Sequence, residues 1–159
     1  MVNFDNIKGN LWLITIIGGI LGVISIFTPA WGEFSGSSFL IVWYSNLYYV
    51  SSSGFHWIPP DELFFSLDLF ALIFIAIATC ILLVAGILDR VKDKKLYILN
   101  IIGGILLILA PTILLAGVGI VEAGFWFYYN VSIAMILPFI GGVLGILSGI
   151  MGIMEKRTG

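Results

Sequence analysis

Few side chains in this sequence are of the types that carry chemistry, and their spacing matches no catalytic motif. His56 is the single histidine and Cys80 the single cysteine, whereas a zinc site needs several such ligands at short spacing. The sequence contains no HExxH, no nucleophile elbow, no phosphate-binding loop and no cysteine–histidine pair. We therefore expect a protein that is not an enzyme, with no catalytic residue, no cofactor and no bound metal. Cys80 lies in an apolar run, where a lone cysteine is expected to be a small, buried core residue.

Asp68 is the one carboxylate that falls inside a long apolar segment. Charge within lipid is expensive and often functional. Two interpretations stay open: Asp68 binds an ion or a proton, or it reaches water or a hydroxyl of a neighbouring helix near the interface. The central turns of the apolar runs hold no Asp, Glu, Lys or Arg that an ion relay across the membrane would need.

The composition is that of a protein surrounded by lipid. Of its 159 residues 60% are hydrophobic and 10% are charged, and the mean hydropathy is +1.15. Soluble domains carry about 25% charged residues, and a soluble protein of this length could not hide so much apolar surface. A formal net charge of −2 argues against binding nucleic acid. These values exclude a soluble enzyme, a nucleic-acid-binding domain and a disordered chain.

The apolar runs predict four membrane-spanning helices, because a span needs about 20 apolar residues. We expect one all-α membrane domain over residues 1–159, with helices near residues 11–28, 63–88, 96–120 and 132–154. All Lys and Arg residues lie before the first helix, between the second and third, or after the fourth. The positive-inside rule then places both termini and loop 89–95 in the cytoplasm of a multi-pass protein of the cell membrane. Loops 29–62 and 121–131 are expected outside.

Aromatic side chains crowd the two outer loops. β-forming runs at Ser37–Tyr44, Leu47–Ser51 and Phe55–Ile58, separated by turn residues, predict a small antiparallel meander lying on the membrane. The run Phe125–Tyr129 would add one more edge strand. We favour a folded contact platform over an interfacial aromatic belt, since amphipathic aromatics also form contact surfaces. The residues of this predicted contact surface are Trp31, Phe39, Trp43, Tyr44, Tyr48, Tyr49, Trp57, Trp126 and Tyr128.

Glycines recur at a spacing of four in the first and fourth predicted helices. Small residues at this spacing let two helix backbones approach closely in lipid. The residues concerned are Gly18, Gly22, Gly141, Gly145 and Gly149. We expect them to pack the helices of one bundle, with oligomerisation left open.

The order of these parts resembles the superfamily of claudins, peripheral myelin protein and epithelial membrane proteins. Trp31 followed by Trp43 resembles the tryptophan pair of the family's first loop, and Ser51-Ser52-Ser53-Gly54 resembles the loop of the myelin protein. Phe127-Tyr128-Tyr129-Asn130 is similar to claudin second loops, and Leu147-Ser148-Gly149 followed by Glu155-Lys156-Arg157 resembles the myelin protein's tail. The chain departs from the family in lacking a Gly-Leu-Trp motif and two loop cysteines. The resemblance implies a four-helix membrane bundle with a β-rich outer loop and roles in adhesion, barrier formation or membrane organisation.

Three functions remain open. The favoured one is a non-enzymatic membrane protein whose aromatic outer sheet contacts a second copy, a neighbouring cell or another membrane protein. The second is an accessory subunit of a larger membrane complex, with the glycine-rich faces of the first and fourth helices as docking seams. The third is a small transporter or ion-binding protein that uses Asp68.

Overall fold

The computed structural model describes residues 9–35, 38–43, 48–57, 63–92, 96–121, 123, 127 and 130–158. Four long helices lie within these ranges: α2 (Leu11–Phe27), α3 (Leu63–Lys92), α4 (Tyr97–Val121) and α6 (Ile133–Thr158). Each begins at its expected residue or one residue later. Helices α3 and α6 run on to Lys92 and Thr158, past the expected ends near 88 and 154, because helical hydrogen bonding does not stop where the apolar run stops.

Three of these helices are long and apolar enough to cross a membrane. Their apolar segments are Ser66–Val91 in α3, Tyr97–Ile120 in α4 and Ile133–Glu155 in α6. Helix α2 is shorter, with 17 residues. At 1.5 Å per residue a helix of that length covers about 25 Å, against about 30 Å of hydrocarbon. The chain is therefore of the membrane-protein class, with three helices that meet the length expected of a span.

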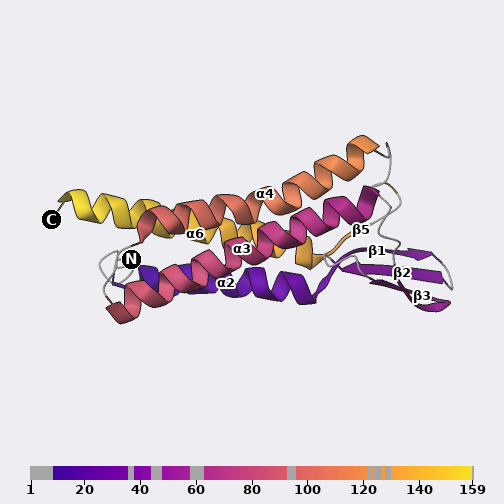
Figure 1. The fold of residues 1–159 in the computed structure, drawn as a ribbon, viewed down its shortest axis with the longest axis horizontal. Coiled ribbons are helices and arrows are strands. Elements are labelled where there is room, and N and C mark those ends of the chain that lie inside the picture. Colours follow the sequence, from indigo (N-terminus) through magenta and orange to yellow (C-terminus); the bar gives the residue numbers. More distant parts are fainter. Residues whose placement is uncertain are drawn as a thin grey trace, which may run out of the picture.

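The four helices pack side by side as a ring of neighbours. Helix α2 lies against α3 and α6, and α4 lies against the same two helices. Figure 1 shows that α2 begins and α6 ends at one end of the bundle, while all the strands lie at the other end, here called the sheet end. Helices α3 and α4 reach further toward the sheet end than α2 and α6.

Each helix buries a narrow stripe and exposes apolar residues elsewhere. In α3 the buried positions Ala71, Ile75, Ala78 and Leu82 recur at alternating spacings of four and three, as one face of a helix requires. Isoleucine and valine side chains on the other faces stay exposed, for example Ile77 at 49%. Such a surface is unfavourable in water and suits contact with lipid chains.

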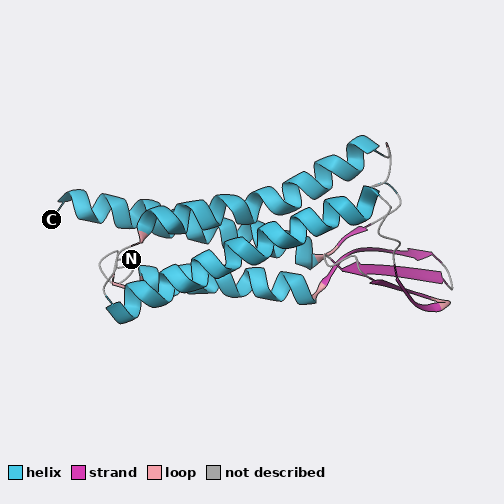
Figure 2. Ribbon diagram, in the orientation of Figure 1, coloured by secondary structure: helices cyan, strands magenta, loops and turns pink. Residues whose placement is uncertain are grey.

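The strands form a single sheet at the sheet end of the bundle (Figure 2). They are β1 (Pro29–Ser35), β2 (Ser38–Trp43), β3 (Tyr48–Ser51), β4 (Gly54–Trp57) and β5 (Asn130–Val131). The order is β4-β3-β2-β1-β5 and every pairing is antiparallel. The expected antiparallel meander is confirmed in β2, β3 and β4. Strand β1 was not expected. The edge strand expected at Phe125–Tyr129 falls, apart from Phe127, outside the described residues, and the described edge strand of this loop is Asn130–Val131.

The sheet is joined to two helices without linkers. Only Thr28 separates α2 from β1, and only Ser132 separates β5 from α6. Strands β1 and β5 pair with each other, and the Ser132 N–H donates to the Ala30 carbonyl at 2.9 Å. These bonds fix the orientation of the sheet on the bundle. In Figure 1 the strands project beyond the end of α2.

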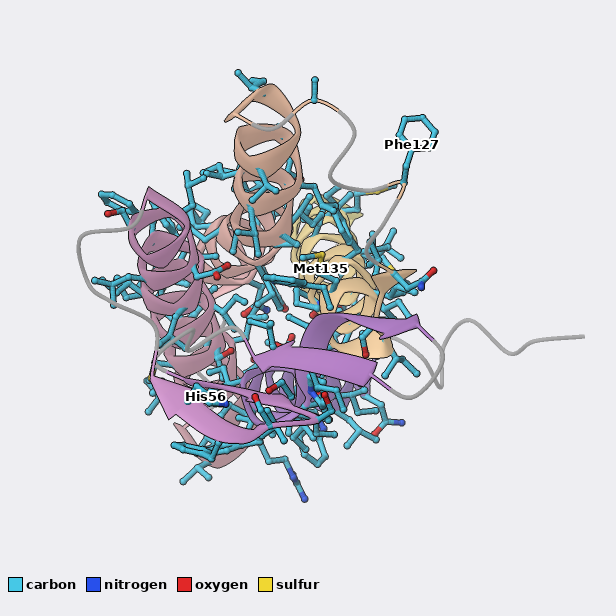
Figure 3. All side chains as sticks on the ribbon, turned by 90° about the vertical axis from the view of Figure 1, so that its right-hand side faces the viewer. His56, Phe127 and Met135 are labelled. Atoms are coloured by element: carbon cyan, nitrogen blue, oxygen red, sulfur yellow. The ribbon has the colours of Figure 1, made fainter. Side chains whose placement is uncertain are left out.

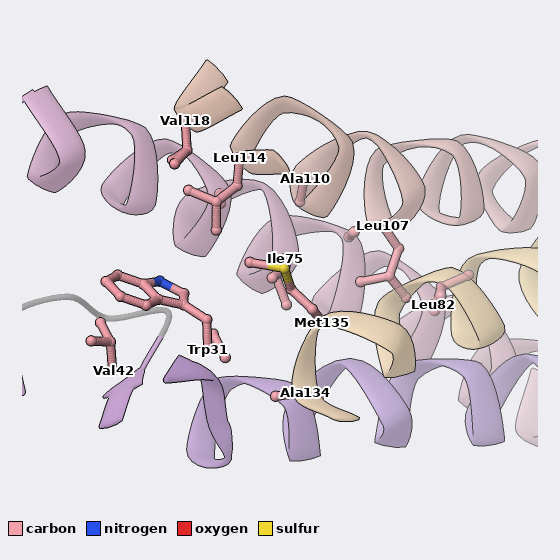
Figure 4. Close-up of a cluster of buried hydrophobic side chains, with 13 residues drawn as sticks. Trp31, Val42, Ile75, Leu82, Leu107, Ala110, Leu114, Val118, Ala134 and Met135 are labelled. Atoms are coloured by element: carbon pink, nitrogen blue, oxygen red, sulfur yellow. The ribbon is translucent and has the colours of Figure 1, made fainter. Parts of the chain in front are cut away.

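One hydrophobic core joins the sheet to the helices (Figure 4). Trp31 and Val42 come from the sheet, and their buried neighbours come from the sheet-end turns of α3, α4 and α6. The helical members beside them include Ala71, Leu114, Val118, Ala134 and Met135. The sheet and the sheet-end turns of α3, α4 and α6 therefore share one core.

Glycines lie where the helix backbones approach most closely. A Cβ atom built on Gly18 would lie 2.7 Å from the Gly141 carbonyl oxygen, and one on Gly141 would lie 2.6 Å from the Gly18 oxygen. One on Gly149 would lie 2.6 Å from the Tyr97 carbonyl oxygen, and one on Gly145 would lie 2.9 Å from Leu82 Cδ2. At Gly22 a Cβ would meet the Thr79 hydroxyl. These glycines face other helices of the same chain.

We predict that Gly18→Val lowers the free energy of unfolding by about 1–3 kcal/mol, because backbone atoms of α6 cannot move aside for the added carbons. The matched control is Ile17→Val, at the neighbouring position on the exposed face of α2 (42% exposed), which should change stability little. Thermal unfolding of both variants in detergent micelles checks the prediction. Equal melting temperatures for the two variants would contradict the close α2–α6 contact.

Candidate functional site

Two neighbouring rows of paired residues cross all five strands of the sheet. The outer row consists of Phe55, Val50, Ile41, Gly32 and Asn130. The inner row consists of His56, Tyr49, Val42, Trp31 and Val131. Because consecutive residues of a strand alternate between faces, the two rows belong to opposite faces of the sheet. Val42 and Trp31 are buried against the helices, so the inner row faces the bundle and the outer row faces away from it.

The outer row presents apolar side chains on the free face of the sheet. Phe55 is 56% exposed, and Val50 and Ile41 are half-buried. Gly32 contributes no side chain, and Asn130 at the β5 edge is exposed. Large apolar side chains in a row on an exposed sheet face are suited to contact with another apolar surface.

Trp31 does not belong to the exposed surface that the sequence suggested. Its side chain is 9% exposed and lies in the core between the sheet and the helices (Figure 4). A β-bulge between Pro29 and Trp31 shifts the register of β1, so that Ala30 and Trp31 are both buried. The expectation that Trp31 is a contact residue is wrong, because the pattern of aromatics cannot show which face of an unforeseen strand is covered.

The other expected surface residues are placed only in part. The backbones of five of them lie in the strands: Phe39, Trp43, Tyr48, Tyr49 and Trp57. Tyr44, Trp126 and Tyr128 lie outside the described residues. In the same segment as the last two, Phe127 is 92% exposed, and Figure 3 shows its ring pointing away from the helices, whereas Met135 lies among them.

His56 is part of a hydroxyl–imidazole cluster on the β3–β4 hairpin. Its Nε2 lies 2.9 Å from Ser53 Oγ, which lies 2.8 Å from Ser51 Oγ. The Ser53 N–H also donates to Ser51 Oγ at 3.3 Å, and Gly54 closes the turn with a φ of 122°, a conformation that glycine adopts without strain. The cluster links the last residue of β3 through the turn to β4, at the edge of the sheet where Figure 3 labels His56.

Asp68 is buried in the same sheet-end region of the bundle. It is 1% exposed, and it precedes Ala71 and Ile75 on the buried face of α3. Its Oδ1 atom has no hydrogen-bond partner among the described residues. No hydroxyl of the described residues therefore reaches Oδ1. A buried polar atom without a partner costs free energy, and Asp68 is thus a candidate for a specific role.

A second group of buried polar side chains joins three helices toward the opposite end. Thr15 Oγ1 of α2 and Ser148 Oγ of α6 lie 2.6 Å apart, and the Asn100 amide of α4 donates to Ser148 Oγ at 3.4 Å. The Ser148 hydroxyl also lies 3.1 Å from the Leu11 carbonyl oxygen. Interhelical hydrogen bonds of this kind hold helices together in lipid, where no water replaces them. We interpret this cluster as structural.

Cys80 is exposed, contrary to the expectation of a buried core residue. The preceding residue Thr79 is buried between the helices, whereas Cys80 lies on the outer face of α3. In the part of the chain that the structure describes, His, Cys, Asp and Glu side chains form no group of three or more that could hold a metal ion.

The contrast between Trp31 and Phe55 can be measured. We predict that Trp31→Ala lowers the free energy of unfolding by about 3–5 kcal/mol, since it empties the core between sheet and bundle. Phe55→Ala should change it by no more than about 0.5 kcal/mol, because the ring is mostly exposed. Denaturant or thermal unfolding in micelles distinguishes the two. A small effect at Trp31 would mean that its ring does not belong to the core.

No protein-family model matches the chain, and no curated protein sequence matches it. A proposed function therefore depends on the sheet surface, the buried carboxyl of Asp68 and the helix contacts.

Proposed function

We propose that this protein is a non-enzymatic, claudin-like membrane protein that makes protein–protein contacts through the free face of its outer sheet. One observation carries the proposal: the apolar outer row is held on the side of the sheet that the bundle leaves uncovered. The residues that matter most are Phe55, Val50 and Ile41. Adhesion or membrane organisation is the expected consequence of such a contact, and another membrane protein or a second copy is the expected partner.

The proposal includes a fourth membrane span, α2. This helix packs on α3 and α6, which are both long and apolar enough to cross. Its exposed side chains are large and apolar, as on its neighbours, and include Ile17, Ile20 and Ile24. A helix of about 17 residues lies at the short limit of known spans, and a bilayer adapts to a short span by local thinning. The four helices then act as one bundle across the membrane.

The sheet end is proposed to face the outside of the cell. Arg90 lies in the last turn of α3, at the end of the bundle opposite the sheet, and its guanidinium lies 5.4 Å from the centre of the Trp12 ring. In the sequence, the other Lys and Arg residues precede the first expected helix, lie between the second and third, or follow the fourth, and so belong to the same side as Arg90. Because cationic residues stay on the cytoplasmic side, the sheet is left on the outer side, where partners on other cells are accessible.

Aromatic positions add to the proposed surface. Phe39 and Trp43 stand two residues from Ile41 in β2, and Tyr48 and Trp57 are paired two residues from the outer row. An aromatic belt would surround the helices at the membrane interface, whereas this sheet projects beyond the end of α2. The projection favours a contact platform.

The glycines that the accessory-subunit hypothesis uses as a docking surface are not accessible to a partner. Gly18 and Gly22 of α2 and Gly141, Gly145 and Gly149 of α6 are buried between helices of this chain. A partner subunit cannot reach them without opening the bundle. A docking surface for a larger complex would therefore lie on the exposed isoleucine-rich faces or on the sheet.

The contact proposal is tested with two aspartate substitutions in one hairpin. Phe55→Asp places a charge in the outer row, whereas Ser52→Asp places the same charge on the exposed turn beside it. We expect crosslinking and co-purification from native membranes to lose partner or self-association with Phe55→Asp, because a charge is unfavourable in an apolar contact. Ser52→Asp should retain it. Identical associations in wild type and both variants would refute a contact role for this face.

The observation at Asp68 favours a second candidate function, the binding of a cation. A cation that binds the folded protein raises its melting temperature. We predict that sodium or calcium chloride, compared with choline chloride at equal ionic strength, stabilises the wild type and not Asp68→Asn. The amide keeps the size of the carboxyl and removes its charge. If neither salt shifts the wild type, or if both proteins shift alike, Asp68 is not an ion site.

A further inference from the structure

A pocket lies where the sheet meets α2 and α6. Its volume is about 330 Å³, near the lower end of the range for small-molecule sites. The residues that line it are Pro29, Trp31, Gly32, Ile41, Asn130, Val131 and Ser132. Most of this lining is apolar, with the amide of Asn130 and the hydroxyl of Ser132 as its polar side chains. The pocket shares Gly32, Ile41 and Asn130 with the proposed contact surface, but neither function proposed above assigns it a ligand.

Gly32 is the residue that makes room for the pocket. In the outer row Gly32 of β1 is paired with Ile41 on one side and with Asn130 on the other. Because glycine has no side chain, a notch remains between the side chains of Ile41 and Asn130. Pro29 and Ser132, at the two junctions between helix and strand, close the notch toward the helices. The pocket is thus built by three strands and two helix ends.

The pocket continues the apolar surface of the helices. Phe27, the last residue of α2, is 75% exposed, and Ile133, the first residue of α6, is 64% exposed. The membrane-spanning segment of α6 begins at Ile133, one residue after the pocket-lining Ser132. The exposed apolar surface of α6 therefore leads into the pocket without an intervening charged residue.

We propose that this pocket binds an acyl chain of a membrane glycerolipid. The acyl chain has the chemistry of the lining, and this inference rests on the proposed membrane position of the bundle, in which the exposed Phe27 and Ile133 face lipid. Water is a poor occupant, because a buried water needs two to four polar partners and the lining is largely apolar. The amide of Asn130 and the hydroxyl of Ser132 lie where the polar ester groups of the same lipid can accept or donate hydrogen bonds.

The test uses the purified protein in phosphatidylcholine vesicles that contain a trace of phosphatidylcholine with a photoreactive diazirine on one chain. After irradiation, mass spectrometry of peptides locates the label. We expect label on pocket-lining residues of β1, β2 or β5 as well as on exposed residues of α6 such as Val143. Label on α6 with none on the sheet would overturn the proposal.

Two tryptophan substitutions distinguish the pocket from the rest of the sheet. Ile41→Trp fills the pocket. Val50 is paired with Ile41 in the sheet, is half-buried like it and lies outside the pocket, so Val50→Trp adds the same ring as a control. We expect Ile41→Trp to abolish labelling of the sheet, with labelling of α6 unchanged as evidence of an intact bundle. Val131→Trp, from the exposed edge of the pocket, should act in the same way. Unchanged sheet labelling in Ile41→Trp, or an equal loss in Val50→Trp, would contradict a lipid-binding pocket.

Discussion

Backbone hydrogen bonding at the two junctions between helix and strand is the constraint on which the rest of this structure depends. Unpaired N–H and C=O groups are costly away from water, so a chain that leaves a helix there must find new partners at once. Here the chain leaves α2 at Phe27 and enters β1 at Pro29, and it leaves β5 at Val131 and enters α6 at Ile133. The pairing of β1 with β5 and the bond from Ser132 to Ala30 supply those partners. The sheet is a consequence of ending two helices at the same level.

The same junction explains why the helices differ in length. Helices α3 and α4 extend beyond α2 and α6. Without the sheet, the apolar side chains on these extensions would be uncovered. The sheet covers them through Trp31 and Val42, which pack against Ala71, Leu114 and Val118. A sheet held in this way presents its other face away from the bundle. The contact surface and the lipid-binding pocket that we propose both follow from that orientation, the first on the free face and the second at its base.

Close backbone packing and hydrogen bonds between helices both stabilise the bundle. Close backbone approach at Gly18 and Gly141 places α2 against α6, and the contact of Thr15 with Ser148 adds a hydrogen bond between the same helices. Neither contribution relies on the hydrophobic effect, which is weak between helices in lipid. Three buried polar atoms have no hydrogen-bond partner among the described residues: Asp68 Oδ1, Thr79 Oγ1 and Asn100 Oδ1. Asp68 differs from the other two in carrying a carboxyl, which is costly to bury in lipid.

The amino-acid sequence by itself determined where the helices begin, which runs form the β2–β4 meander and which glycines lie at spacings that suit close helix contact. These features are local, since they depend on apolar length, strand alternation and residue size within one segment. Only the tertiary structure decided that Pro29–Ser35 is a strand, that Trp31 is buried and that Cys80 is exposed. It also decided that Gly32 opens a pocket between Ile41 and Asn130. Each of these depends on a partner from a distant part of the chain, and a local pattern carries no information about the face that such a partner covers.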